Sequence, residues 1–372
     1  MDQSLRTAII GLLASAAILV AAKTAMSSPR ERAKRIEVAF VLDTTGSMEG
    51  LIDGAKRKII WSIANSIVDI NPNADIRMGL IGYRDIGDDY VVRTHDMSAD
   101  IQGLYGRLMK FQADGGGDGP ESVNEALDAA VRDLEWSSGD EVRRIVFLVG
   151  DAPPHMDYPN GPQYPEILRK AHQNGIIVNA VQVGGAPDTY EFWQDIARLG
   201  DGKYFAIPED GGQVEVHTSP YDNDIMTLQR KIDGTAVPYG SQARQEEVRA
   251  KLGEKAAAPA AVQVDNSKFY AKRTSVKEIV TGGGDLLDDL RNKVRDVEDI
   301  KADEMPPELK GKTSDEIKAV VAARTAEREK LEAEMAELVK RRDSHIAADI
   351  SSQPVRQDSF DKQVEAGISA QF

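Results

Sequence analysis

The 372-residue chain has no cysteine, so it can form no disulfide, zinc–thiolate site or iron–sulfur cluster, and it has no thiol nucleophile. Basic residues are also scarce, since 46 Lys and Arg stand against 61 Asp and Glu, for a formal charge of −15. This deficit argues against nucleic acid as a partner, because binding to phosphates requires a basic surface. Carboxylates in excess remain compatible with a site for a hard metal cation. A hydrophobic content of 41% is ordinary for a globular protein and excludes a wholly disordered chain.

Long apolar runs are rare, and one stands at the N-terminus. Residues 7–22 carry no charge and lie between Arg6 and Lys23. This order of a basic residue, an apolar segment and small residues predicts a secretory signal peptide. The alternative is an uncleaved membrane anchor, although the segment is shorter than the usual span of about 20 residues. Either way, we expect a periplasmic or extracellular protein, which an uncleaved segment would hold to the cytoplasmic membrane, with residues 23–35 as a linker.

Apolar segments that fit buried strands alternate with helical patterns between residues 36 and 212. Strands buried on both faces and separated by helices predict an α/β domain with a doubly wound, mostly parallel sheet. The expected strands are residues 36–42, 76–83, 90–94, 144–149, 176–183 and 203–207. The expected helices are residues 51–67, 101–111, 122–135, 165–174 and 188–199.

The remaining residues change in character and predict a mainly helical C-terminal region. We expect a polar linker with short helices over 213–312, a long charged helix over 313–346 and a tail over 347–372. Within the polar part, the Ala-rich, low-complexity segment 255–262 is predicted to be a linker. The glycine triplet 282–284 is predicted to be a flexible linker. Thr313 and Glu316 have the spacing of a capping box. The seam of the long helix contains many charged residues, so packing against another helix of the chain is favoured over self-association as a coiled coil, which stays open.

Oxygen-bearing side chains follow the expected strands, at the sheet edge where doubly wound folds bind ligands. The first strand ends in Asp43, Thr44, Thr45, Gly46 and Ser47, and Asp151 follows the fourth strand. The first loop contains no His or Cys. Such a donor set suits Mg²⁺, Mn²⁺ or Ca²⁺ and not zinc.

These motifs resemble the von Willebrand factor type A domain over residues 36–210. The resemblance implies a metal-ion-dependent adhesion site, in which Asp43, Thr45 and Ser47 take the positions of an Asp-x-Ser-x-Ser loop. Asp151 matches the aspartate of the third loop. The site would hold a divalent cation and bind a protein partner that presents an Asp or Glu to the metal.

The second loop departs from the family pattern, which often has Gly-Gly-Thr. Here Gly-Gly is followed by Asp118, the first choice as a ligand, and Ser122 is the reserve. The Asp-Thr-Thr-Gly-Ser-Met sequence of the first loop, together with the Gly-Asp-x-Pro-Glu sequence of this loop, resembles a bacterial, hemicentin-like branch of these domains.

The resemblance implies a non-enzymatic adhesion or scaffold module without catalytic residues. An alternative is a Mg²⁺-dependent enzyme similar to aspartyl-phosphate phosphotransferases, with Asp43 as the nucleophile. Against it, position 44 is not a Lys and position 45 is not an acid.

A histidine and an acidic cluster close to these motifs are expected to have structural roles only. We expect His155 to be a loop residue at the rim of the site. The acidic cluster Asp85, Asp88 and Asp89 is expected to be a solvated turn, in preference to a second cation site.

Overall fold

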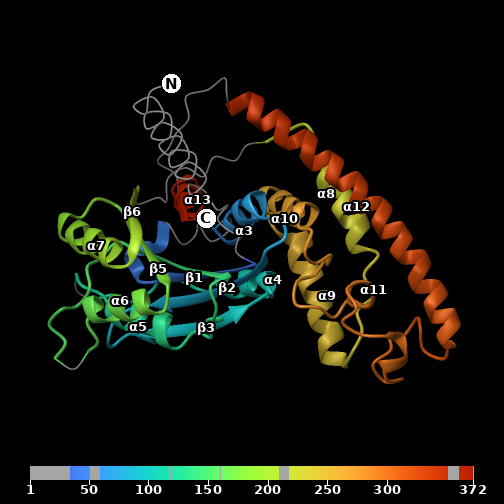
Figure 1. Ribbon diagram of the computed structural model, residues 1–372, viewed down its shortest axis with the longest axis horizontal. Helices are drawn as coiled ribbons and strands as arrows, with labels where there is room; N and C mark the ends of the chain where they lie inside the picture. The colour runs from blue at the N-terminus through green and yellow to red at the C-terminus, as the bar shows by residue number, and fades with distance from the viewer. Residues whose placement is uncertain are drawn as a thin grey trace, which may run out of the picture.

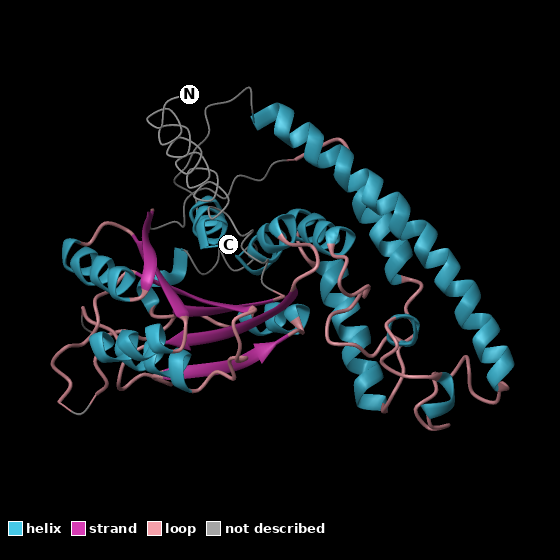
Figure 2. Ribbon diagram, viewed as in Figure 1, coloured by secondary structure: helices cyan, strands magenta, loops and turns pink. Residues whose placement is uncertain are grey.

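The computed structural model describes residues 34–50, 59–117, 119–159, 161–208, 218–350 and 360–371. The predicted export segment 7–22, most of the linker 23–35, residues 51–58 and Asp118 lie outside these ranges. Figure 1 shows a layered unit built around a sheet, with a helical region beside it. Figure 2 shows that the strands all belong to the first unit. In the described ranges no helix combines the length and the apolar character needed to cross a membrane.

The sheet has six strands in the order β3-β2-β1-β4-β5-β6. The strands are β1 (Arg35–Asp43), β2 (Asp75–Tyr83), β3 (Val92–Ser98), β4 (Val142–Gly150), β5 (Ile176–Val183) and β6 (Asp201–Ile207). Neighbouring strands are parallel except for β2 and β3, which are antiparallel. This confirms the predicted mostly parallel, doubly wound sheet. β3 begins later than predicted, and Tyr90, expected within it, instead places its hydroxyl 2.6 Å from Thr44 Oγ1.

Alternate residues of the strands face two separate apolar layers. On one face, Ile36, Val38 and Phe40 of β1 pack with α3 (Ile59–Ile70) and α4 (Ile101–Leu108). The other face carries α5 (Val123–Arg132), α6 (Tyr164–Gln173) and α7 (Pro187–Leu199). A short 3-10 helix, Gly46–Met48, follows β1.

The end of the chain returns to the sheet, which corrects the prediction of a tail over 347–372. Helix α13 (Phe360–Gln371) packs against α3, and its Val364 and Ile368 are fully buried in the same apolar layer. A Cβ on Gly367 would lie 2.9 Å from the Phe205 ring, so the helix approaches β6 closely. Figure 1 shows α13 and α3 on the side of the sheet opposite α5 and α6. The α/β domain therefore does not end near residue 212, because the last helix completes it.

The region between β6 and α13 is helical and ordered from residue 218 to 350. It contains α8 (Asp222–Asp233), α9 (Gln242–Ala257), α10 (Ala260–Lys272), α11 (Leu286–Arg291), the 3-10 helix Val297–Asp299 and α12 (Ser314–Ile350). The predicted linker 255–262 is wrong, because it forms the end of α9 and the start of α10. Lys255 is buried there, with its amine 2.8 Å from Asp233 Oδ1. The low-complexity sequence of residues 255–262 therefore belongs to two Ala-rich helices and not to a linker.

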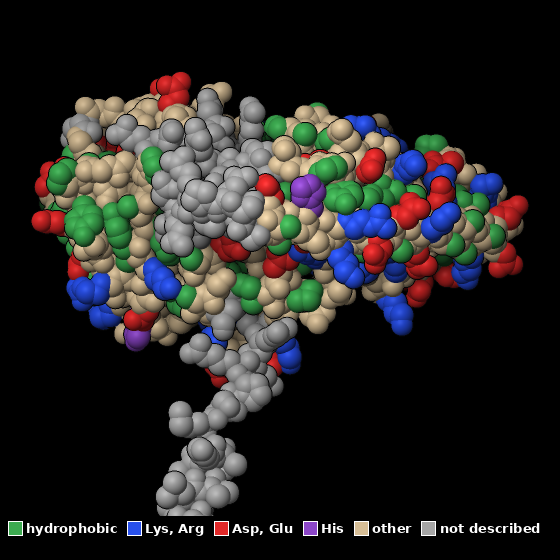
Figure 3. All heavy atoms as spheres, turned by 90° about the horizontal axis from the view of Figure 1, so that it is seen from above, with side chains coloured by type: hydrophobic (Ala, Val, Ile, Leu, Met, Phe, Trp, Pro, Cys, Tyr) green, Lys and Arg blue, Asp and Glu red, His purple; other side chains and the backbone are tan. Residues whose placement is uncertain are grey.

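Helix α12 is fixed by contacts at both of its ends and along one face. Thr313 and Glu316 form the predicted capping box, with the Thr313 N–H donating to Glu316 Oε2 at 2.8 Å. Met335 and Val339 are buried in an apolar cluster with residues of α8 and α10. This confirms that the seam of the long helix packs within the chain. On the face shown in Figure 3, basic and acidic side chains are mixed over this region.

A fully buried arginine joins α12 to α11. Arg328 donates to Asp285, to Asp288 Oδ1 at 2.7 Å and to Thr235 Oγ1 at 2.7 Å. The glycine triplet before Asp285 was predicted to be flexible, but all three residues have φ between +77° and +92° in an ordered turn. Glycine is needed there because other residues adopt positive φ at a cost.

Ile368 provides a test of the role of α13. Replacing a fully buried Ile with Ala removes apolar contacts and leaves a cavity, which costs about 2–5 kcal/mol. We therefore expect Ile368→Ala to lower the free energy of unfolding by that amount in denaturant titrations. The matched control is Ser369→Ala, an exposed neighbour on the same helix, which should change stability little. Equal stability of the two variants would show that α13 is dispensable for the domain.

Candidate functional site

The site lies where β1 and β4 end, next to each other at the centre of the sheet. β1 pairs with β2 on one side and with β4 on the other, so the strand order reverses at this point. Asp43 is the last residue of β1, and Asp151 directly follows β4. Doubly wound sheets bind ligands at this position, outside the carboxyl ends of the strands.

A continuous series of contacts joins four of the predicted site residues. Asp43 Oδ1 accepts hydrogen bonds from the Thr45 N–H at 2.8 Å and from Thr45 Oγ1 at 2.6 Å. Thr45 Oγ1 lies 3.2 Å from Ser47 Oγ, which in turn donates to Asp151 Oδ1 at 3.1 Å. Asp43 and Thr45 are buried, whereas Ser47 is exposed, so the series runs from the protein interior to its surface.

Neighbouring residues fix the loop that carries Asp43 and Thr45. Thr44 points away from them, and its hydroxyl donates to the Tyr83 carbonyl at 2.8 Å. A Cβ on Gly150 would collide with the Tyr83 hydroxyl, so the close approach of β4 to the site requires glycine. Thr44 therefore has a structural role, whereas Thr45 faces the site.

The third loop is held by α7. The Thr189 hydroxyl donates to the backbone carbonyl of Asp151 at 2.9 Å, and Trp193 Nε1 donates to that of Ala152 at 3.2 Å. These bonds fix the backbone at Asp151 and leave its side chain directed to Ser47.

The second loop differs from what the sequence suggested. Asp118 lies outside the described residues. Ser122, the reserve ligand, is buried and donates its hydroxyl hydrogen to Asp85 Oδ1 at 2.9 Å. Its hydroxyl therefore supports the neighbouring loop of Asp85.

Glu121 is a site residue that the sequence reasoning missed. Its side chain is 3% exposed. Its N–H donates to the Pro153 carbonyl at 2.9 Å and its carbonyl accepts from the His155 N–H at 3.1 Å, which ties it to the third loop. A Cβ on Gly116 would lie 3.0 Å from Glu121 Oε1 and 3.2 Å from Thr45 Cβ. The Glu121 carboxylate and Thr45 thus flank the same glycine. The Gly-Asp-x-Pro-Glu pattern contained this residue but gave no indication of its position.

Burial and like charges raise the proton affinity of these acids. Burial, followed by the charge of Asp151, raises the pKa of Asp43 to about 7. Burial, followed by the charges of Asp43 and Asp85, raises the pKa of Glu121 to about 9. Within the described part of the chain, Asp43 Oδ2 and Glu121 Oε2 are buried without a hydrogen bond, and neither acid forms an ion pair. The Tyr83 hydroxyl, itself without a hydrogen bond, lies close enough to the Asp43 carboxylate to lower its pKa.

These residues fit a hard divalent cation. Across the described residues no three His, Asp or Glu side chains gather as a ready ligand cluster, so hydroxyl groups must complete the donor set. Asp43, Thr45, Ser47 and Asp151 supply two carboxylates and two hydroxyls in contact with one another. The unpartnered Asp43 Oδ2 is a buried acceptor that a cation would satisfy.

The acidic cluster beside the site is not a solvated turn, contrary to expectation. Asp85 is buried and accepts a hydrogen bond from the Tyr158 hydroxyl at 2.9 Å, and Asp88 accepts one from the Gly116 N–H at 3.0 Å. Only Asp89 of the three is exposed. His155 is a loop residue as predicted, but it is buried and stacked on Tyr158 at a centroid distance of 4.0 Å.

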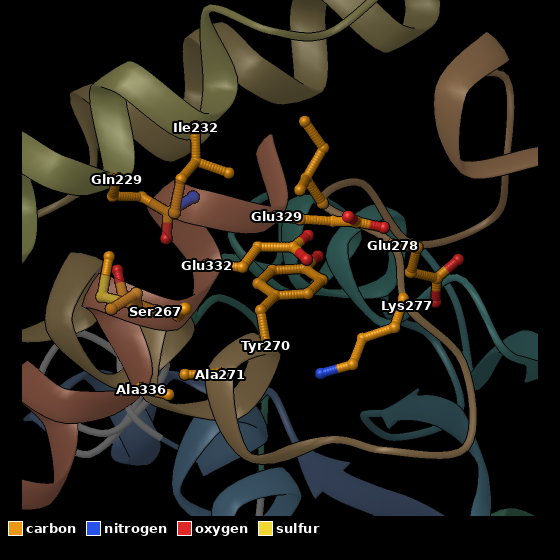
Figure 4. A pocket seen from close by; sticks show the side chains of 13 residues that line it. Gln229, Ile232, Ser267, Tyr270, Ala271, Lys277, Glu278, Glu329, Glu332 and Ala336 are labelled. Carbon is orange, nitrogen blue, oxygen red and sulfur yellow. The ribbon is translucent and has the colours of Figure 1, made fainter. Parts of the chain in front are cut away.

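A separate cavity of about 270 Å³ lies in the helical region, between α8, α10 and α12. Figure 4 shows Tyr270 and Glu332 among the side chains that line it. Two of its acids already have basic partners, because Glu278 pairs with Arg273 at 2.6 Å and Glu332 pairs with Arg291 at 2.8 Å. The strand-end site, where Asp43 and Glu121 form no ion pair, is the stronger candidate.

Comparisons with known proteins found similarity for the α/β part of the chain. Residues 37–206 match the family model described as the von Willebrand factor A domain. No curated protein sequence matches the chain.

Similar solved structures include proximal thread matrix protein 1 from the mussel byssus, at 15% identity and a TM-score of 0.33. That match covers 48% of this chain and 43% of the mussel protein, less than half of its length. The SpRpn10 VWA domain is similar at 14% identity and a TM-score of 0.35, over 47% of this chain and 88% of that domain.

The raised pKa values predict how the metal-free protein depends on pH. A carboxyl group whose pKa is higher in the folded protein than in the unfolded chain stabilises the fold at low pH, and this stabilisation is lost as the pH rises through the folded value. For Asp43 that value is about 7, so metal-free protein should lose about 1–3 kcal/mol between about pH 5 and pH 8. Thermal unfolding in chelator measures this.

Asp43→Asn should reduce the slope of this pH profile without abolishing it, because the amide does not titrate while Glu121, whose pKa is raised to about 9, still does. The control is Asp89→Asn, which alters an exposed acid of the neighbouring loop and should keep the slope. A stability that rises from pH 5 to pH 8 in the parent protein would contradict the assignment.

Proposed function

We propose that the protein is a non-enzymatic interaction module that binds a divalent cation at the strand-end site and docks a partner's Asp or Glu on it. The observation that carries the proposal is the contact series from Asp43 through Thr45 and Ser47 to Asp151, with Asp43 Oδ2 left without a partner. The match of residues 37–206 to the von Willebrand factor A domain supports it, since such domains are generally interaction modules.

The donor set explains how a bound cation would act as a docking point. Hydroxyl ligands such as Thr45 and Ser47 add no negative charge, so the cation keeps an attraction for a further carboxylate. Because the chain has a charge of −15, the surface as a whole repels acidic partners, and salt screens this beyond about 10 Å. Capture must therefore depend on the local field of Mg²⁺, Mn²⁺ or Ca²⁺.

The phosphotransferase alternative receives no specific support. A lysine would be expected after the nucleophilic aspartate, but Thr44 stands there and bonds to the Tyr83 carbonyl. Two residues after Asp43 stands Thr45, whose hydroxyl cannot serve as a carboxylic general acid.

Thr45→Val tests the cation site from within the chain. The change removes a ligand oxygen but keeps the β-branched shape, and we expect it to weaken Mg²⁺ or Mn²⁺ binding by at least about tenfold, or 1.4 kcal/mol. Titration calorimetry on chelator-treated protein measures the affinity. Thr44→Val is the matched control, because its hydroxyl bonds to the Tyr83 carbonyl and not to the site, so its loss should weaken cation binding less than Thr45→Val does.

A pulldown of partner proteins tests whether the cation is also the docking point. A partner recovered from envelope extract in the presence of Mg²⁺ should be lost in chelator and with Thr45→Val. Capture that persists in both conditions would mean that the cation is not the docking point.

We place the protein outside the cytoplasm, either released or held by the membrane through residues 7–22. This part of the proposal rests on the uncharged segment between Arg6 and Lys23. Mass spectrometry of protein from its host should find a mature N-terminus near Lys23, or an intact chain in the membrane fraction. Intact protein that begins at Met1 in the soluble cytoplasmic fraction would refute it.

A further inference from the structure

The cavity of about 270 Å³ between α8, α10 and α12 is a feature that the proposed function leaves unexplained. Protein interiors are closely packed and contain few voids larger than a water molecule. Here the space exists because small side chains line facing helices, with Ala271 on α10 and Ala333 and Ala336 on α12. Pockets for drug-sized molecules usually measure about 300–1,000 Å³, so this cavity suits a smaller ligand.

One wall of the cavity is apolar. Ile232, Ile279 and Met335 line it and are buried. Tyr270 also lines it, and its hydroxyl is already engaged, because it donates to Gln102 Oε1 at 3.2 Å. Figure 4 shows the Tyr270 ring among the lining side chains. The tyrosine therefore offers a ligand its ring, and this wall favours a ligand with an apolar body.

The buried polar side chains of the lining have their donors in use and present acceptors. Gln229 is 6% exposed, and its Nε2 donates to Asp233 Oδ1 at 2.8 Å. Within the described part of the chain its Oε1 forms no hydrogen bond, and Figure 4 shows this oxygen turned toward Ser267, another residue of the lining. The Ser267 hydroxyl donates to the Gln263 carbonyl at 2.7 Å, which leaves only its lone pairs. A ligand must therefore supply hydrogen-bond donors.

The charged side chains of the lining favour a cation. Three of the four are acids, Glu278, Glu329 and Glu332, and the fourth is Lys277. The basic partners of Glu278 and Glu332, described above, lie outside the lining, and Glu329 forms no ion pair among the described residues. Figure 4 shows Glu329 and Glu332 on one side of Tyr270 and the Lys277 amine on the other. The charge of −15 on the chain adds a field that attracts cations.

We propose that this cavity binds a small organic ammonium ion, with its apolar body against the Tyr270 wall and its ammonium group beside Glu329 and Glu332. An ammonium group brings three donors and a positive charge, which the acceptor-rich, acidic lining lacks. Lys255 lies near the Tyr270 ring, with its amine 4.6 Å from the centroid, but this charge is neutralised by Asp233 at 2.8 Å. The proposal is independent of the cation site at the strand ends.

Calorimetry on the full chain with three matched probes tests the ligand chemistry. Benzylamine, benzyl alcohol and benzoate share one ring and differ in a head group that is positive, neutral or negative at neutral pH. Benzylamine should bind most tightly, benzyl alcohol at least about fivefold more weakly, and benzoate not detectably. Equal affinity for the alcohol, a preference for benzoate, or no saturable binding of benzylamine would overturn the proposal.

Glu329→Gln tests the contact with the ammonium group. Because Glu329 is exposed and its ion pairs are weakened by solvent, we expect a loss of at least about threefold in benzylamine affinity, with benzyl alcohol unaffected. The matched control is Glu334→Gln, which removes the same charge from an exposed position of α12 outside the lining and should retain the parent affinity. Equal effects of the two variants would mean that only general charge matters, contrary to the proposal.

Two filling variants test the location. Ala333 and Ala336 are exposed on α12, so a larger side chain at either position should enter the cavity without disturbing the core. Ala336→Leu and Ala333→Leu should each abolish benzylamine binding, while circular dichroism shows an intact fold. Either variant decides if the other does not fold, and parent-like binding to a folded variant would place the probe elsewhere and overturn the proposal.

Asp43→Asn separates this cavity from the strand-end site. Benzylamine affinity should be the same in this variant and in chelator as in the parent protein, whatever happens to the binding of Mg²⁺. A loss of benzylamine binding in Asp43→Asn would assign the probe to the strand ends and refute the cavity as its site.

Discussion

Negative charge gathered at the ends of β1 and β4 is the constraint around which the site is built. Elsewhere among the described residues, some buried acids pair with a basic side chain, as Asp285 and Asp288 do with Arg328. At the strand ends, Asp43 and Glu121 are buried without such a match among the described residues. A cation bound at Asp43 would compensate this buried charge.

The fold holds these buried acids in place, despite their mutual repulsion, by fixing each loop separately. Thr44 and Tyr83 hold the first loop, α7 holds the third, and Asp88 receives the backbone of the glycine-rich second loop. The two apolar layers beneath, formed by helices on both faces of the sheet, provide the stability against which the repulsion acts. The site can therefore remain assembled before an ion arrives, instead of forming around it.

The sequence predicted the sheet because its strands are apolar runs buried on both faces, and it predicted Asp43 and Asp151 because they directly follow two of these runs. Glu121 could not be found in this way, since its place depends on the backbone at Gly116 and on pairing with Pro154, far along the chain. Helix α13 was missed for a similar reason. It is short, and its few apolar residues are buried only because they pack against Phe205 and other residues of an apolar layer that lie much earlier in the sequence.

The first strand and the last helix of the chain share one apolar layer, with the whole helical region inserted between them. During synthesis, β1 to β6 leave the ribosome long before α13 exists, so one face of the sheet must wait, partly uncovered, until residue 371 has been made. The helices of residues 218–350 make many contacts among themselves and can fold in that interval. Completion of the α/β domain thus depends on residues made well after its sheet, and a product truncated before α13 would expose the apolar face that this helix covers.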